Sequence, residues 1–451
     1  MKQHRDNDDI LIIDASRGFV KDGKNNKLRA CDIKKIADTI RERSNIPGFS
    51  KRVSRDDIRA NDYNLNIPRY IDSSIREATF DIYATVFGGI PNSEIDNLKP
   101  YWDAFPSLKK QLFKEEADRP YSSVQVDDIG GIIVENPDVL HFKHSFATAF
   151  NGFDDELHDL LITHIDTVKE LQAQDTIAIS VFRRLEGIPL VDKYAAYQSL
   201  AENWTGITND IEMIQSEGLD AVRAVEVAYK LVKKNDEEIE VEDGLKGRIL
   251  PFELVQSIRF VNELDEITSK QVRIDEIENE LIEIRDGLTD EESLEYLDAD
   301  DDTKVDKAKV KKDAKKNTGE IEPETLIKLK ALVTLWDELS KLNRIIRNLR
   351  KELIEKTKQA IESLSDEEAQ FFLHEKWIKP IMKGITNSAN AELDSIIKKI
   401  TALAAKYALP LSNLDNDLSV VQKELCELVG DLAGDDFTIA GLNGFIASFD
   451  L

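Results

Sequence analysis

A run of leucines and isoleucines between residues 332 and 353 constrains the fold of this chain more than any other feature. Its members are spaced alternately by three and four positions: Leu332, Leu335, Leu339, Leu342, Ile346, Leu349 and Leu353. This spacing places one apolar stripe along a helix and is typical of the seam of a coiled coil. A second series repeats every seven residues: Ile267, Ile274, Leu281 and Leu288. We therefore predict an antiparallel coiled-coil hairpin formed by residues 264–288 and 326–355.

The seam of this hairpin also supplies our candidates for partner docking, which are Leu339, Leu342, Ile346 and Leu349. Between the two apolar series lie an acidic run, Asp298 to Asp302, and a lysine-rich stretch, Lys304 to Lys316. Because no apolar periodicity connects them, we expect a flexible charged tip over residues 298–320. Contact between the lysines and DNA is the alternative interpretation.

The first 72 residues combine strand and helix patterns. Ile10–Asp14 is almost wholly apolar, as in a strand of a parallel sheet that is buried on both faces. Residues 32–43 predict a helix with Ile33, Ile36, Ala37 and Ile40 on one face. Tyr63–Tyr70 alternates apolar and polar residues as a strand does, although Pro68 must end it or keep it at an edge. The segment therefore looks like the end of a larger Rossmann-like α/β domain.

The remainder predicts a mainly α protein. Residues 73–260 form a helical middle region that glycines and prolines divide into short elements. Its aromatic residues Tyr101, Trp102, Phe105 and Phe113 have helical spacing, and we expect them to pack in a core rather than to stack on bases. Residues 261–356 form the hairpin, and residues 357–451 form a C-terminal helical region with a capping-type start at Ser365 to Glu368.

Charge is distributed unevenly along the 451 residues, whose net charge is −27. Residues 1–70 hold 16 Lys and Arg against 11 Asp and Glu, a balance of +5. The rest holds 44 basic and 76 acidic residues, a balance of −32. Since phosphate attraction dominates non-specific binding to nucleic acids, most of this surface should repel DNA. The chain should reach DNA only through a complex.

The sequence has no pattern of an independent catalytic centre. Cys31 and Cys426 are too far apart for a metal-ligand spacing, and the six histidines form no zinc-protease pattern. The sequence contains no GxGxxG or GxxxxGK[ST] phosphate loop and no GxSxG elbow. It also contains no apolar run long enough for a membrane span and no signal-peptide pattern at its start. We expect a cytoplasmic location, no metal and no membrane contact.

Two strings carry a resemblance to a known family. ILIIDASR (10–17) and NDYNLNIPRYID (61–72) resemble the closing segment of the methylase domain in the M subunit of type I restriction–modification systems. Asn64, Asn66, Pro68, Arg69 and Tyr70 belong to the more specific string, and their role is unknown. Further strings resemble the C-terminal part of longer members: FGGIPNSEIDNLKPYWDAFPSL (87–108), YAAYQSLAENW (194–204), ILPFELVQSIRF (249–260), HEKWIKPI (374–381) and ELDSIIKKITALAAKYALPL (392–411).

The resemblance implies adenine-specific DNA methylation with S-adenosylmethionine, in complex with a DNA-specificity subunit and usually a restriction subunit. The sequence also departs from the pattern of this family. The methyl-donor pocket and the catalytic Asn-Pro-Pro-aromatic tetrapeptide of such enzymes precede the strand at 10–14, and this chain contains no Pro-Pro pair. We therefore name no catalytic and no cofactor-binding residue, and expect the missing N-terminal methylase half as a partner.

Two other functional classes are compatible with the pattern. One is a non-catalytic structural or interaction protein built on the hairpin. The other is an acidic decoy that mimics DNA, although 60 Lys and Arg and a basic N-terminal segment speak against it.

Overall fold

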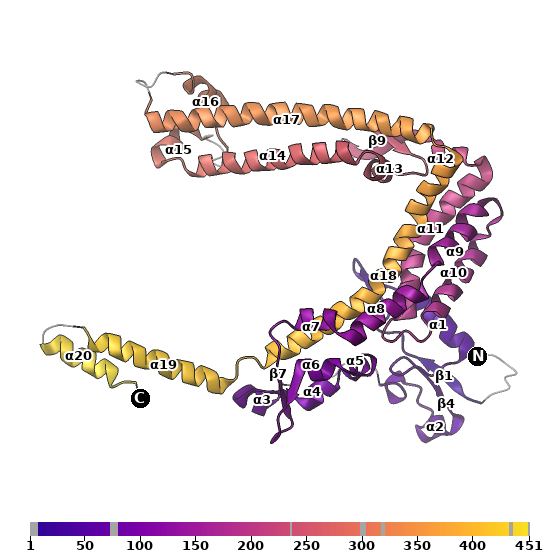
Figure 1. The fold of residues 1–451 in the computed structure, drawn as a ribbon, viewed down its shortest axis with the longest axis horizontal. Helices are drawn as coiled ribbons and strands as arrows, with labels where there is room; N and C mark the ends of the chain where they lie inside the picture. Colours follow the sequence, from indigo (N-terminus) through magenta and orange to yellow (C-terminus); the bar gives the residue numbers. More distant parts are fainter. Residues whose placement is uncertain are drawn as a thin grey trace. The chain divides into compact units, whose positions relative to one another are not determined.

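The structure is a computed structural model that describes residues 8–72, 80–234, 237–297, 304–316, 321–432 and 436–449. These residues are mainly helical, with four small antiparallel sheets among them (Figure 1). The chain divides into two compact units. Unit 1 comprises Met1–Asp159, Lys169–Gly206 and Lys379–Leu451, and unit 2 comprises Leu160–Val168 and Ile207–Ile378. The predicted mainly helical class is confirmed at this level, whereas the Rossmann-like origin of the N-terminal segment stays a prediction.

The strands are short apart from one long hairpin. They are β1 (Ile10–Ile13), β2 (Val20–Asp22), β3 (Asn25–Lys27), β4 (Ser50–Val53), β5 (Ile90–Pro91), β6 (Phe113–Glu115), β7 (Tyr121–Val124), β8 (Val225–Lys234) and β9 (Glu237–Gly247). β1 pairs with β4, β2 with β3, and β8 with β9, while β7 lies between β5 and β6.

The helices up to residue 223 are mostly short. They are α1 (Ala30–Glu42), α2 (Arg55–Ala60), α3 (Ile82–Phe87), α4 (Asn92–Asp96), α5 (Lys99–Ala104), α6 (Leu108–Leu112), α7 (Ile129–Glu135), α8 (Pro137–Ala149), α9 (Phe153–His158), α10 (Glu170–Arg184), α11 (Lys193–Glu217) and α12 (Asp220–Arg223). Three single-turn helices add to them: η1 (Ile67–Arg69), η2 (Asp159–Thr163) and η3 (Ile165–Thr167).

The later helices include the longest of those described. They are α13 (Phe252–Arg259), α14 (Val261–Asp286), α15 (Asp290–Tyr296), α16 (Lys307–Asp313), α17 (Pro323–Glu362), α18 (Asp366–Lys406), α19 (Leu411–Gly430) and α20 (Asp436–Ile446). None of the described helices is long and apolar enough to cross a membrane.

The N-terminal segment closes a small core on one face of the β1–β4 ladder. Ile10 lies opposite Val53 in this antiparallel pair, and Ile12 packs with Val53, Ile58 and Tyr70. The predicted strand at 10–14 is present, but its other apolar side chains are only half-buried. Two-sided burial in a parallel sheet was therefore the wrong expectation, because β1 forms a two-stranded antiparallel pair with β4 and only Ile12 of its four residues is fully buried.

Residues 63–70 do not form the predicted strand. Asp62 and Tyr63 have positive φ values of 53° and 57°, and the chain then enters the single-turn helix η1. The Asn64 side chain accepts a hydrogen bond from the backbone N–H of Asn66 at 2.9 Å. Such local bonds from asparagine compete with strand pairing, and Pro68 suits the first turn of a short helix. The alternation of apolar and polar residues therefore reflected a turn.

The two apolar series form a helix pair in unit 2. α14 and α17 lie side by side along most of their length (Figure 1). Ion pairs between Glu263 and Lys356 at 3.0 Å and between Arg273 and Glu338 at 3.0 Å show that the helices are antiparallel. The contact contains the buried residues Ile267, Ile274, Ile346 and Leu353, together with the half-buried Leu339, Leu342 and Leu349. Supercoiling and regular knobs-into-holes packing remain predictions.

The region expected as a flexible tip contains more structure than its composition suggests. Residues 298–303 and 317–320 lie outside the described residues, but α16 forms from the lysine stretch and packs on α17. Val310 and Ala314 are buried there against Tyr296 and Trp336. A spacing of four residues places Val310 and Ala314 on one face of the helix. Two residues are too few for a periodicity, so the sequence analysis missed this helix.

The predicted packing role of the four middle-region aromatics is confirmed. Tyr101, Trp102, Phe105 and Phe113 are all buried in unit 1. The Trp102 ring meets Phe113 edge-on, and its Nε1 donates a hydrogen bond to the Ile95 carbonyl at 2.7 Å. A buried indole with a satisfied N–H is a core element and presents no face on which a base could stack.

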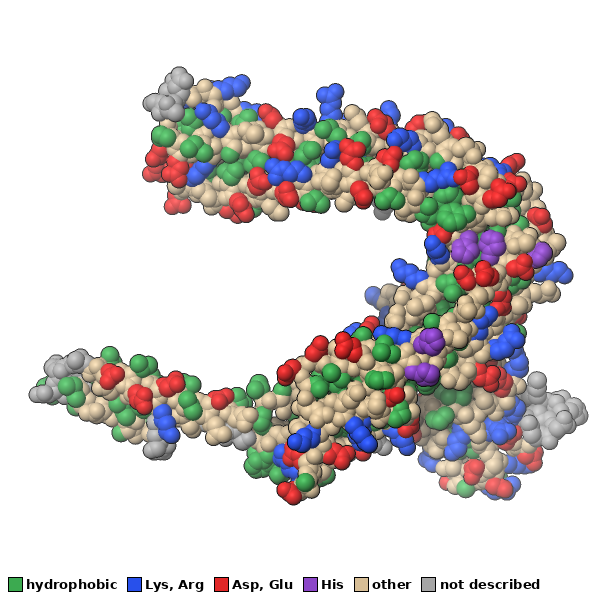
Figure 2. Space-filling model, viewed as in Figure 1, with side chains coloured by type: hydrophobic (Ala, Val, Ile, Leu, Met, Phe, Trp, Pro, Cys, Tyr) green, Lys and Arg blue, Asp and Glu red, His purple; other side chains and the backbone are tan. Residues whose placement is uncertain are grey.

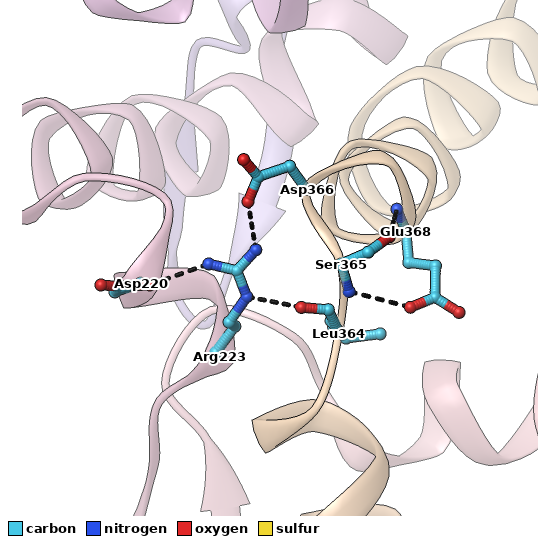
Figure 3. A network of polar contacts seen from close by, with 6 residues as sticks. All are labelled: Asp220, Arg223, Leu364, Ser365, Asp366 and Glu368. Atoms are coloured by element: carbon cyan, nitrogen blue, oxygen red, sulfur yellow. Dashed lines mark hydrogen bonds and ion pairs between the residues drawn. The ribbon is translucent and has the colours of Figure 1, made fainter.

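Arg223 holds together the joint between α17 and α18 in unit 2 (Figure 3). Its Nε donates to the Leu364 carbonyl at 2.7 Å, one Nη pairs with Asp220 at 2.8 Å, and the other pairs with Asp366. Beside it, the predicted capping box is confirmed. The Ser365 hydroxyl accepts from the Glu368 N–H at 3.2 Å, and the Glu368 carboxylate accepts from the Ser365 N–H at 2.9 Å.

Candidate functional site

The N-terminal segment of unit 1 holds a small cavity of about 310 Å³ where β1 ends and α1 begins. Five charged side chains from residues 14–35 line it: Asp14, Arg17, Arg29, Asp32 and Lys35. Asp192 and Tyr194 line it from the start of α11, and Gly48 and Phe49 from the turn before β4. This cavity mixes both signs of charge, so it does not favour one ionic ligand.

Arg29 and Asp32 form a fixed charged pair at this cavity. Arg29 donates from Nε to Oδ2 of Asp32 at 2.9 Å and from Nη2 to Oδ1 at 3.1 Å, and its backbone N–H also donates to the carboxylate at 3.0 Å. The hydrogen bond from Arg29 lowers the pKa of Asp32. A Cβ on Gly18 would lie 3.0 Å from this carboxylate. Asp32 is therefore an ionised, hydrogen-bonded wall residue and a poor general base.

Cys31 offers no nucleophile to the cavity. It is buried, and its backbone N–H donates to the Gln198 side chain at 2.9 Å. Burial raises the pKa of the Cys31 thiol and also that of the Tyr194 phenol. A nucleophilic cysteine needs the thiolate form, so a thiol whose pKa is raised is unreactive near neutral pH.

The motif at residues 64–70 divides into one anchor and an exposed surface. Tyr70 is buried, and its hydroxyl donates to the Asn64 carbonyl at 2.6 Å. The side chains of Asn64, Asn66, Pro68 and Arg69 are exposed. Tyr63 and Leu65, beside them, are 65% and 52% exposed. Asp62 and Tyr63, which precede the motif, both have left-handed backbone conformations. Such a conformation is strained in residues other than glycine, and strain of this kind is frequently found in binding loops.

Helix α1 presents its apolar side outward. Ile33 and Ile40 are 55% and 57% exposed and Ala37 is exposed, whereas Asp38 and Thr39 are buried. Asp38 is compensated by Lys34, whose Nζ lies 2.9 Å from its carboxylate. The predicted helix is present, but of its predicted apolar face only Ile36 is half-buried, at the cavity, while Ile33, Ala37 and Ile40 are exposed. A face of this kind is the usual mark of a surface that another protein segment covers.

We searched the described residues for an arrangement that could bind a metal ion or S-adenosylmethionine. Among them, no group of three or more His, Cys, Asp and Glu could hold a metal ion. Dinucleotide-like ligands of open α/β sheets bind at the carboxyl ends of parallel strands. β1 pairs with β4 alone, in an antiparallel ladder, so this arrangement does not fit S-adenosylmethionine. We assign no residue of this chain to a methyl donor.

The four seam residues named as docking candidates contact their own chain. Ile346 is buried, and Leu339, Leu342 and Leu349 pack against α14. Large exposed apolar side chains instead gather on α19 and α20 and on the residues that border these helices. They are Leu411, Leu414, Leu418, Val420, Val421, Leu425, Leu428, Leu432, Phe437, Ile439 and Phe445. Sequence reasoning missed this surface because an amphipathic helix carries no mark of whether its apolar face is covered.

Comparison with known proteins bears on the same N-terminal segment. The model of the N-6 DNA Methylase family matches residues 1–78. This segment resembles the methylase subunits of type I restriction enzymes. The methylase subunit of the type I restriction enzyme MpnII from Mycoplasma pneumoniae is 37% identical over 83 residues, and that of MjaVIII from Methanocaldococcus jannaschii is 40% identical over 76 residues.

These matches cover a small part of each protein. They comprise 18% and 16% of this chain, and the chain spans only 15% and 13% of the length of these two curated relatives. No solved structure matches the chain. The resemblance expected for the C-terminal strings after residue 87 therefore stays a prediction, as do the activity and the partners of the whole protein.

Proposed function

We propose that this chain is the C-terminal part of a type I restriction–modification methyltransferase subunit, and that it is inactive alone. It would act in adenine-specific DNA methylation within a complex. A complementary methylase segment would carry the donor pocket and the catalytic tetrapeptide, and a specificity subunit would select the DNA. The observation that carries this proposal is the family resemblance of residues 1–78, combined with the uncovered apolar face of α1 inside that same segment.

The exposed apolar side chains of α1 are the reason to propose a methylase segment as the partner that covers this helix. In a layered α/β domain, a helix buries its apolar side against a sheet. Ile33 and Ile40 lie one heptad apart on α1 and have no such sheet in the described chain. The exposed motif around Asn64 to Arg69 belongs to the same matched segment and would add polar contacts. The complementary methylase segment is therefore the partner whose chemistry fits this surface best.

The α19–α20 surface supports a helical partner such as a specificity subunit. Figure 2 shows apolar side chains along these helices, with acidic ones between them. Amphipathic helices bury apolar faces of this kind against other helices. A restriction subunit would join as a further component. DNA would be contacted only in the assembled complex, because most of the chain is acidic.

S-adenosylmethionine would supply the methyl group in the assembled enzyme. The chain's own contribution is structural: it would cover the methylase sheet through α1 and hold the assembly through its helices. Since neither a phosphate-type glycine loop nor a Pro-Pro pair occurs in the sequence, purified chain alone should not transfer methyl groups.

A reconstitution assay tests the proposal. Transfer of labelled methyl groups to duplex DNA is measured with this chain alone, then with a family methylase segment that ends before the ILIID strand and a specificity subunit. We expect incorporation only in the complete mixture. Incorporation by the chain alone would overturn the proposal. A soluble complex without methylation would favour the alternative, a non-catalytic interaction protein built on the α14–α17 helix pair.

A pair of matched variants ties the assay to α1. Ile33→Asp combined with Ile40→Asp should abolish both assembly and activity, because it charges the face that the methylase segment covers. Leu171→Asp is the control, since Leu171 is 79% exposed on α10 of the same unit and lies outside the proposed contact. Equal loss in both variants would argue against a role for the α1 face.

A further inference from the structure

The long helix α17 of unit 2 carries a dense group of cations in its second half. Arg344, Arg347, Arg350 and Lys351 follow one another closely, and residues 339–351 contain no Asp or Glu. We call these four residues the basic stripe. A stripe of this kind runs against the composition of the chain, whose net charge is −27. The methyltransferase proposal uses none of its residues.

Helical spacing places the basic stripe on the side of α17 that faces away from α14. Arg344 is two positions from both Leu342 and Ile346, which pack against α14, and two positions correspond to a turn of about 200° around a helix. Arg347 and Lys351 follow Arg344 at steps of three and four, so they lie on the same side of α17. The stripe is therefore an outer surface of the helix pair.

The basic stripe is exposed and has no acidic partner. All four side chains are exposed, and within the described part of the chain no carboxylate pairs with any of them. Lys356, further along the same helix, instead pairs with Glu263 of α14 at 3.0 Å. Lys and Arg side chains project from the α17 edge of this helix pair in Figure 2. The cations of the stripe are thus available to an anion from outside.

The spacing of the basic stripe is unfavourable for the helix itself. Like charges three or four positions apart on a helix repel one another, and Arg347 has such neighbours on both sides. The apolar seam against α14 stabilises α17 without needing these cations. A polyanion bound along the stripe would turn the repulsion into attraction.

Duplex DNA is the polyanion that fits the stripe best. Arg344, Arg347 and Lys351 are separated by about 4.5 and 6 Å along the helix axis, and a duplex presents one phosphate charge per about 1.7 Å of its own axis. An extended acidic peptide carries at most one charge per about 3.3 Å. Three of the four cations are arginines, whose planar guanidinium binds phosphate through two parallel hydrogen bonds. Asn348, exposed among them, adds an amide donor of the kind that contacts phosphate and sugar.

We propose that the basic stripe of α17 contacts the phosphate backbone of duplex DNA. This inference rests on the proposed function, which brings the chain to DNA within a complex. The contact is independent of base sequence, because it involves phosphates and not base edges. Exposed charges more than about 8 Å away are largely screened at about 0.15 M salt, so the stripe can attract phosphates although the whole chain is acidic. Glu352 and Glu355 follow the stripe, so the contact ends at Lys351.

Fluorescence anisotropy of the full chain with a labelled duplex tests this contact. The assay measures no methyl transfer, so its failure is distinct from failure of the reconstitution assay. Weak binding should appear at about 0.05 M salt, and the logarithm of the binding constant should fall with the logarithm of the salt concentration with a slope of roughly −3 to −4. Absence of binding at about 0.05 M salt would overturn the proposal.

A triple variant locates the contact on α17. Arg344→Gln, Arg347→Gln and Lys351→Gln together should reduce the magnitude of the salt slope by roughly 2 to 3 and weaken binding at about 0.05 M salt at least about tenfold. Glutamine is a good helix former, so circular dichroism should stay as in the unsubstituted protein. The double variant Arg344→Lys and Arg347→Lys keeps the charge and should keep the slope. Loss of the slope in this double variant would contradict a phosphate contact based on charge.

A matched control removes the same charge from another part of unit 2. Three exposed lysines outside the stripe are replaced: Lys312→Gln, Lys315→Gln and Lys330→Gln. This control should keep the salt slope of the unsubstituted chain. Equal losses in the two triple variants would reduce the binding to an effect of net charge and overturn the assignment.

Competition distinguishes DNA from an acidic protein as the partner. Unlabelled duplex should displace the labelled duplex at an at least about tenfold lower concentration of negative charge than poly-glutamate does, because the charges of DNA are more closely spaced. Equal competition by poly-glutamate would identify the basic stripe as a surface for an acidic protein and would overturn the proposal.

Discussion

The Nε of Arg223 donates a hydrogen bond to the backbone carbonyl of Leu364, 2.7 Å away, across 141 positions of sequence. Leu364 is buried and lies where α17 ends, so its carbonyl has no helical partner further along the chain. A single guanidinium thus satisfies this carbonyl and also binds Asp220 and Asp366. One side chain from α12 thus links a residue just after α17 to the first residue of α18.

Arg223→Met should destabilise unit 2 by roughly 1–3 kcal/mol, because a buried carbonyl loses its donor. Hydrogen exchange of peptides covering residues 360–368 should accelerate. Arg248→Met is the control in the same unit, since Arg248 forms a partly exposed ion pair with Glu217 at 2.6 Å. It should cost less than about 1 kcal/mol. Equal losses of stability in the two variants would show that the hydrogen bond to the Leu364 carbonyl does not stabilise unit 2.

Leu342→Asp should cost about 2 kcal/mol or more, because it introduces a carboxylate into the α14–α17 contact. Ile327→Asp, on the same helix, should change stability by less than about 0.5 kcal/mol, since Ile327 is 69% exposed. Thermal unfolding of the full chain followed by circular dichroism measures both. An unchanged transition for Leu342→Asp would refute the seam assignment.

The stability of unit 2 should decrease at acidic pH because of Glu292. Burial alone would raise its pKa, but hydrogen bonds from Lys328 at 2.8 Å, Thr325 at 2.6 Å and the Thr289 N–H at 2.8 Å lower the pKa to about 2. The ordinary value is 4.5. A lowered carboxylate pKa stabilises the fold above the unfolded-state pKa, and this contribution, at most about 3 kcal/mol, disappears as the pH falls from 4.5 towards 2.

Glu292→Gln isolates that contribution from the many other carboxylates of the chain. The difference in melting temperature between the two proteins should be largest near pH 7 and should shrink steadily below pH 4.5. Glu291→Gln, the matched neighbour on the exposed side of α15, should track the unsubstituted protein throughout. A difference that does not vary with pH would mean that Glu292 acts through packing alone.

The isolated chain should bind duplex DNA weakly. At about 0.15 M salt we expect a dissociation constant above about 1 µM, because the balance of −32 outside the first 70 residues opposes phosphate attraction. Fluorescence anisotropy with a labelled duplex measures this constant. Submicromolar binding would contradict the expectation, and its loss on neutralising Lys309 and Lys312 would assign DNA contact to α16.

Helix periodicity was the part of the fold that the sequence predicted best. The 3–4 steps from Leu332 to Leu353 and the capping box at Ser365 both depend on local geometry, which a short window contains. Burial was harder to predict, because it depends on which neighbours are present. For that reason the exposure of α1 and of β1 differs from expectation. The turn at Asn64 was mistaken for a strand because its apolar and polar residues alternate as they do in a strand.

The candidate site was predictable only as a motif. The string from Asn64 to Tyr70 carried the family resemblance, but the sequence did not show that Tyr70 is buried and bonded through its hydroxyl to the Asn64 carbonyl while its neighbours are exposed.

Under the proposed function, the outward isoleucines of α1 link the lifetime of the chain to the supply of its partner. A copy that assembles covers Ile33 and Ile40, whereas a copy made in excess keeps them in water and can gain by self-association. Cellular proteases and chaperones act on such unassembled copies. The steady-state abundance of the chain should therefore follow the abundance of the segment that covers α1.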